Sequence, residues 1–165
     1  MSVSSFGFSL YNETKAGLAY SRKLGEMFSV GVQLDYLTVG IAENYGRAYA
    51  FVGEIGILAK LTKELTVGAH VYNPNRAKIA TYNNERISSI MRFGANYSFS
   101  EKVFLSAEME KDMDRKPIFK TGLEYHISEP LFVRAGIATN PFVTSFGFGL
   151  KLKQFEVDFA TSYHT

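Results

Sequence analysis

The sequence contains no cysteine and no tryptophan among its 165 residues. Without cysteine, a disulfide framework, thiol chemistry and a cysteine-based metal site are all excluded. The net charge of +2 gives no reason to expect a nucleic-acid partner. There are only four prolines, and no stretch approaches the roughly 18 consecutive apolar residues of a transmembrane helix. The remaining composition, with 14 Phe, 10 Tyr and 14 Gly, is typical of aromatic-rich strands joined by tight turns.

Residues 141–165 carry the clearest pattern in the chain. Large apolar side chains recur at every second position from Phe146 to Leu152, and they recur again from Phe155 to Phe159. The intervening positions are glycine, serine or charged residues. Side chains alternate between the two faces of a strand, so this pattern predicts a β-hairpin that turns at Lys153 and Gln154.

The same alternation runs through the rest of the chain, without a helical period. We therefore expect about eleven strands in an all-β, antiparallel up-and-down meander. The predicted connections alternate between two kinds. One kind is a short polar turn: Gly25-Glu26, Lys63-Glu64, Glu101-Lys102, Glu129-Pro130 and Lys153-Gln154. The other kind is varied and often longer: Asn12–Lys15, Glu43–Arg47, Asn73–Glu85, Lys111–Lys116 and Thr139–Pro141.

Two architectures fit this alternation. In a soluble barrel or sandwich the apolar faces form the core, whereas in a transmembrane barrel they face lipid and the polar faces line the lumen. Long apolar faces, mixed charges with glycine on the polar faces, and aromatic residues near strand ends favour a transmembrane β-barrel of about 10–12 strands. The candidate lumen-facing residues are Asp35, Glu54, Arg92, Glu108, Glu110, Lys120, Glu124, Arg134, Lys151, Glu156 and Asp158.

The two kinds of connection predict which end of the barrel faces outward. Outer-membrane barrels have short periplasmic turns and longer external loops. The candidate extracellular loop residues are Asn73, Arg76, Asn83, Asp112 and Asp114. Bacterial single-chain barrels have an even number of strands, whereas this chain gives about eleven. We therefore expect a single barrel domain over residues 1–165 that is part of a larger barrel, without its signal peptide and a closing C-terminal strand.

Residues 128–165 resemble the C-terminal strands of Bacteroidetes-type outer-membrane barrels. The resemblance rests on LFVRAGIATNP and on FGFGLKLKQFEVDFATSYH. These barrels are relatives of the long-chain fatty-acid channel family and of the PorV/PorQ-like accessory barrels of type IX secretion. The resemblance implies a location in the outer membrane of Gram-negative bacteria. It also implies porin-like transport or a scaffold role beside other outer-membrane or secretion components.

No chemical constellation in the sequence predicts an enzyme, a metal site or a cofactor. The three histidines belong to different strands without ligand spacing, and Asp112-Met113-Asp114 lacks the glycine and closing glutamate of a calcium loop. Glu108 and Glu110 share one face, but charge pairing in a lumen explains them better than acid–base catalysis. The glycines of residues 146–150 alternate within a strand, which indicates close packing or curvature.

The sequence therefore predicts an outer-membrane β-barrel whose main partner is the lipid bilayer. It would act as a channel for hydrophobic or small solutes or as a membrane scaffold in secretion. The alternative is a soluble β-barrel that binds an apolar ligand in its interior.

Overall fold

The computed structural model describes residues 1–8, 11–41, 46–79 and 86–164. These residues form eleven β-strands, and the prediction of an all-β meander is confirmed. The strands are β1 (Ser2–Phe8), β2 (Tyr11–Leu24), β3 (Phe28–Ile41), β4 (Gly46–Lys60), β5 (Leu65–Tyr72), β6 (Ile90–Ser98), β7 (Val103–Asp112), β8 (Ile118–Ser128), β9 (Leu131–Ala138), β10 (Val143–Lys151) and β11 (Glu156–His164). Among the described residues, no helix has the length and apolar character needed to cross a lipid bilayer.

The strands follow one another in chain order across a single sheet, from β1 to β11. The pairings that define this order are antiparallel, as between β2 and β3 or between β10 and β11. Within the described residues the sheet is not closed, because β1 is paired with β2 and β11 with β10 at the two ends of the order. The meander is thus established, whereas a closed barrel remains a prediction.

The described residues group into two compact units. The first unit comprises Met1–Ile57, His70–Met91 and Asp112–Asp114, and the second comprises Leu58–Ala69, Arg92–Lys111 and Arg115–Thr165.

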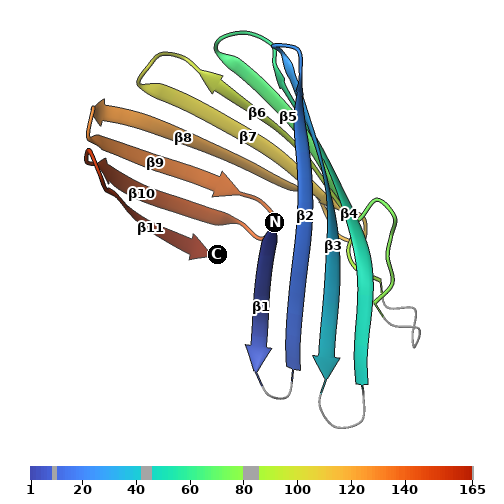
Figure 1. Ribbon diagram of the computed structural model, residues 1–165. Helices are drawn as coiled ribbons and strands as arrows, with labels where there is room; N and C mark the ends of the chain where they lie inside the picture. The colour runs from blue at the N-terminus through green and yellow to red at the C-terminus, as the bar shows by residue number, and fades with distance from the viewer. Residues whose placement is uncertain (9–10, 42–45, 80–85, 165) are drawn as a thin grey trace. The chain divides into compact units, whose positions relative to one another are not determined.

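In the first unit, β1 to β4 lie side by side (blue to green in Figure 1). The strand β2 pairs with β3 over its whole length, from Tyr11 opposite Ile41 to Leu24 opposite Phe28. The predicted turn at Asn12–Lys15 is wrong, because these residues belong to β2 and pair with both neighbouring strands. Their polar composition indicates a turn, but continuous pairing on both sides keeps them extended.

In the second unit, β7 to β11 lie side by side (yellow to red in Figure 1). The strand β8 has the expected two-residue period. Phe119, Leu123, Tyr125 and Ile127 are exposed, whereas Lys120, Glu124 and His126 on the other face are half-buried. The strand β8 ends at Ser128 and β9 ends at Ala138, directly before the predicted connections Glu129-Pro130 and Thr139–Pro141.

Buried apolar side chains are few among the described residues. They are Leu37, Ala50, Val52, Ala59 and Phe132. Large apolar side chains such as Leu18 (71% exposed) and Phe146 (61% exposed) lie uncovered on the apolar face of their unit. The hydrophobic face predicted from the sequence is therefore present, and it is not covered by other parts of the same unit.

Candidate functional site

The polar face of the first unit carries a cluster of ionic residues from four neighbouring strands. Lys15 Nζ on β2 lies 2.8 Å from Asp35 Oδ2 on β3 and 2.9 Å from Glu54 Oε1 on β4. The other oxygen of Glu54 lies 3.0 Å from His70 Nε2 on β5. Asp35 is completely buried, and Gln33 Nε2 donates to its Oδ1 at 2.7 Å. A buried carboxylate is stable only when it is paired in this way, so Lys15 is the residue that makes the position of Asp35 possible.

Two features around this cluster fix its geometry. The Lys15 ammonium lies 5.1 Å from the centre of the Tyr72 ring, a cation–π distance. Gly17 lies beside Asp35, and a Cβ at this position would overlap Asp35 Oδ1 and stand 2.8 Å from Ser2 Oγ. The missing side chain of Gly17 thus provides the space that the Asp35 carboxylate occupies.

The polar face of the second unit carries a first ionic cluster on β6, β7 and β8. Arg92 Nε donates to Glu110 Oε2 at 2.9 Å. Lys120 Nζ donates to the same oxygen at 2.8 Å and to Glu108 Oε1 at 3.0 Å. Each cation is matched to a carboxylate on a neighbouring strand, so the cluster cancels most of its own charge.

A second ionic cluster of this unit lies on β8, β9 and β11. Arg134 donates from Nε to Glu124 Oε2 at 2.6 Å and from Nη1 to Asp158 Oδ1 at 2.9 Å. Glu124 Oε1 also lies 2.6 Å from His126 Nε2. Singly, such exposed pairs contribute about 0–1 kcal/mol, but a shared network holds its side chains in defined positions.

Aromatic residues accompany this second cluster on the polar face. The Arg134 guanidinium lies 4.4 Å from the centre of the Phe132 ring. The centre of the His126 ring lies 5.6 Å from that of Phe132 and 5.1 Å from that of Phe104. Phe132 is only 4% exposed, although it points to the polar side. Gly149, its register partner on β10, leaves the space that this ring fills.

The structure brings nine of the eleven candidate lumen residues into these three clusters. Lys151 and Glu156 do not join them; they are register partners at the end of the β10–β11 hairpin. Sequence reasoning missed Lys15, because the predicted strand began one residue later, at Ala16. Continuing the two-residue period from Gly17 back to Lys15 would have identified it. The contacts of the Tyr72 and Phe132 rings with Lys15 and Arg134 depend on packing, and no pattern in the sequence indicates them.

The structure also places most of the candidate loop residues. Arg76 and Asp114 are exposed, Asp112 ends β7, and Asn83 lies outside the described residues. Asn73 is fully buried at the base of its loop. Its Nδ2 donates to Ile87 O at 2.7 Å, and its Oδ1 accepts from Ala77 N at 2.8 Å. Ser89 Oγ donates to its carbonyl at 2.8 Å. Asn73 therefore ties the two sides of the loop together.

Replacing Asn73 with alanine is expected to lower the free energy of unfolding by about 2 kcal/mol, because buried groups lose their partners. Denaturant titration of the folded protein measures the change. Asn75→Ala is the matched control: Asn75 is exposed and makes two hydrogen bonds, to Gly53 N and Phe51 O. An equal effect of the two substitutions would contradict the role assigned to burial.

Among the described residues, no group of three or more His, Asp or Glu side chains is arranged to hold a metal ion. No model of a known protein family matches the chain, and no curated protein matches it. The resemblance to Bacteroidetes-type barrels therefore rests on the sequence segments that suggested it.

Proposed function

We propose that this chain forms a β-barrel of the bacterial outer membrane and lines a hydrated passage for small polar solutes. The observation that carries the proposal is the contrast between the two faces of each unit. One face exposes large apolar side chains, and the other holds ion pairs between neighbouring strands. This distribution is the one that lipid outside and water inside would select.

The size of the apolar face indicates that it does not remain in water. In the second unit, twelve large apolar residues on β8 to β11 are each at least about one-third exposed: Phe119, Leu123, Tyr125, Ile127, Val133, Ile137, Phe146, Phe148, Leu150, Val157, Phe159 and Tyr163. Covering this surface would yield on the order of 10 kcal/mol, at roughly 1.5–3 kcal/mol for each fully buried side chain. That amount is comparable with the whole stability of a domain. In the outer membrane, lipid tails would cover this apolar face.

The polar face favours small polar solutes over hydrophobic ones. Its carboxylates and cations are paired across strands, so it offers hydrogen-bonding groups with little net charge. Among the described residues of this face in the second unit, the aromatic rings are buried or half-buried, as Phe132 and Phe104 are, and offer a hydrophobic solute little surface. The scaffold role in secretion has the sequence resemblance as its support, and no contact in the described residues favours it.

Refolding with and without detergent micelles tests the membrane assignment. We expect a compact band on gels that shifts on heating, and we expect it only for the sample folded in detergent. A folded, soluble monomer without detergent would contradict the proposal. It would favour the alternative barrel with an apolar interior, for which the hollow of about 400 Å³ between residues such as Leu123, Val133 and Phe148 would be a candidate ligand site.

Lipid vesicles carrying the folded protein test the transport role. Their permeability to small ions and sugars is expected to exceed that of empty vesicles. A folded, detergent-dependent protein that leaves permeability unchanged would favour the scaffold role.

A further inference from the structure

Negative charge is in excess in two of the three ionic clusters. In the first unit, Lys15 is shared by two carboxylates. In the second unit, Arg134 is likewise shared by Glu124 and Asp158. Each of these clusters also contains one histidine, which adds positive charge only when it is protonated. With neutral histidines, each of the two clusters therefore has one more negative charge than positive charges.

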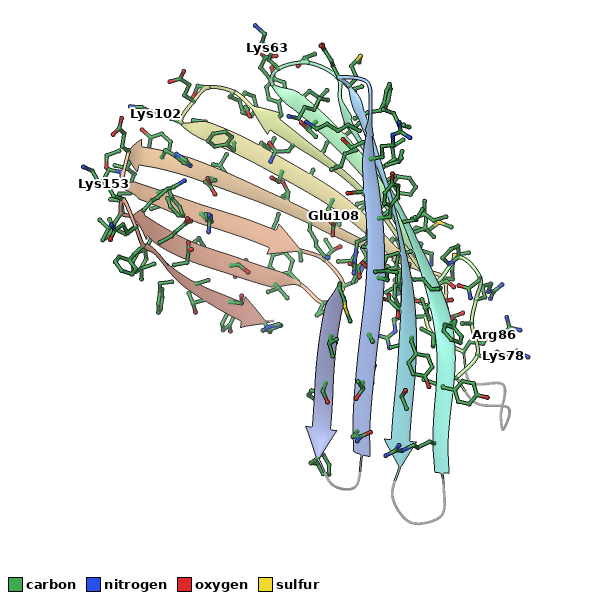
Figure 2. All side chains as sticks on the ribbon, viewed as in Figure 1. Lys63, Lys78, Arg86, Lys102, Glu108 and Lys153 are labelled. Carbon is green, nitrogen blue, oxygen red and sulfur yellow. The ribbon has the colours of Figure 1, made fainter. Side chains whose placement is uncertain are left out.

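Two other groups of charges in the second unit are balanced. The cluster on β6, β7 and β8 contains two cations and two carboxylates, and Lys151 and Glu156 are register partners of opposite charge. Figure 2 shows Glu108 of the balanced cluster along the strands, away from Lys102 and Lys153 in tight turns at the strand ends. Among these polar-face groups, the negative excess of the unit thus belongs to the cluster on β8, β9 and β11.

The two negative clusters differ in how well water reaches their carboxylates. Asp35 is completely buried, and the Glu54 side chain is only 17% exposed. The Asp158 side chain is 46% exposed, which is the largest value among the carboxylates of the three clusters. A hydrated ion that passes along the polar face can therefore approach Asp158, whereas the cluster of the first unit offers it little access.

The contacts of this cluster hold Arg134 in place. Gly147, the register partner of Arg134 on β10, has no side chain that would separate Arg134 from β11. Arg134 Nη1 reaches across β10 and donates to Asp158 Oδ1 at 2.9 Å. Its Nε donates to Glu124, and its guanidinium packs against the Phe132 ring. An anion would have to displace one of these contacts to bind the guanidinium, whereas a cation can approach the exposed side of Asp158 directly.

We propose that the passage favours small cations over small anions, and that Asp158 and Glu124 determine this preference in the second unit. Carboxylates that line a passage attract cations and repel anions, as the acidic rings of cation channels do. A charged surface with low-dielectric walls also raises the local concentration of counter-ions. The inference rests on the proposed function, since it needs the polar face to line a hydrated passage.

The reversal potential across a planar lipid bilayer that contains the folded protein tests the preference. The two sides hold KCl at different concentrations at about pH 8, above the range in which histidine side chains ordinarily gain a proton. We expect the ratio of K⁺ to Cl⁻ permeability to exceed one. It should fall as KCl is raised on both sides, because salt screens exposed charges. A ratio of one or less, or a ratio that salt does not change, would overturn the proposal.

Charge variants of the cluster should move this ratio in opposite directions. Asp158→Asn is expected to lower it about twofold, because one exposed charge changes the concentration of an ion beside it by at most about fivefold in water, and salt reduces this effect. Arg134→Gln is expected to raise it by a similar factor. Asp158→Glu keeps the charge and should retain the ratio of the unchanged protein. If Asp158→Glu lowered the ratio as much as Asp158→Asn, the charge would not be the cause.

A matched control removes a carboxylate that lies outside the clusters. Glu129 is exposed in a tight turn of the same unit, so Glu129→Gln should leave the permeability ratio unchanged. Equal effects of Glu129→Gln and Asp158→Asn would contradict the proposal.

The same recordings separate this inference from the proposed function. Conductance without a preference for K⁺ would overturn the inference and leave the passage in place, whereas a folded protein without any conductance would overturn both. The detergent-dependent, heat-shifted band shows whether each variant folds. If Arg134→Gln did not fold, the comparison of Asp158→Asn with Asp158→Glu would decide alone.

Discussion

Replacing Lys15 with methionine is expected to lower the free energy of unfolding by about 3 kcal/mol. The substitution removes the cation that lies 2.8 Å from Asp35 Oδ2 and leaves a completely buried carboxylate with Gln33 as its neutral donor. Removing one partner of a buried pair costs roughly 3–5 kcal/mol, and the lower end applies because the Lys15 side chain is 30% exposed. Denaturant titration of the folded protein measures the effect.

Two further substitutions decide whether the unpaired charge is the cause. Asp35→Asn in the Lys15→Met background removes the charge while keeping the shape of the side chain. This double variant should recover most of the lost stability. Lys63→Met removes a lysine from an exposed turn and should change stability by less than about 0.5 kcal/mol. Equal effects of Lys15→Met and Lys63→Met would show that the cluster does not stabilise the unit.

The sequence predicts the meander well because a period of two is a local property. Short polar turns such as Lys63-Glu64 and Glu129-Pro130 interrupt this period clearly, and the structure confirms them as connections. The strand β5 has the predicted bounds, Leu65–Tyr72. For the same reason, the polar faces of β8 and β9 place Glu124 and Arg134 on one side of the sheet, where they form an ion pair.

Prediction was weaker where pairing or packing overrides local composition. Asn12–Lys15 consists of residues that favour turns, yet hydrogen bonding to two neighbouring strands keeps this segment in β2. Asn73 lies in a polar segment that is typical of an exposed loop, but it is buried and hydrogen-bonded to Ala77 and Ser89, which lie 4 and 16 residues further along the chain. The sequence does not indicate that the loop folds back to form these hydrogen bonds. Closure of the sheet depends on the meeting of distant strands, and local periodicity contains no information about it.

For Phe132, the local period predicts the face correctly, whereas its burial depends on packing. Its position in the two-residue period assigns Phe132 to the polar face, where an aromatic residue is unexpected, and no sequence pattern indicates a role for it. The glycines of β10 were interpreted as a sign of close packing or curvature. The contact between Gly149 and the Phe132 ring confirms close packing at this position. Phe132 and Gly149 are register partners, so the large residue fills the space that the small one leaves.

Gly149→Ala is therefore expected to destabilise the second unit by about 3 kcal/mol. A Cβ at this position would overlap the Phe132 ring and would lie 2.6 Å from Asp158 Oδ1. The ring would have to leave its buried position, which loses apolar burial as well as the contact with the Arg134 guanidinium. Overpacking costs about 1–3 kcal/mol and complete loss of a buried phenylalanine costs about 3–5 kcal/mol, so a ring that is displaced but stays partly buried is expected at about 3 kcal/mol, where the two ranges meet. Denaturant titration of the folded protein measures the change.

The cause can be isolated with a matched glycine and a double variant. Gly122→Ala, on β8 of the same unit, would place its Cβ 3.6 Å from Ala135 O, an ordinary contact, and should change stability by less than about 1 kcal/mol. Phe132→Ala removes the ring that Gly149 accommodates. On that background, Gly149→Ala should cost less than about 1 kcal/mol, because the two residues interact and their effects are not additive. If Gly149→Ala cost the same with and without the ring, the overlap with Phe132 would not be the cause, and the contact with Asp158 would be the remaining explanation.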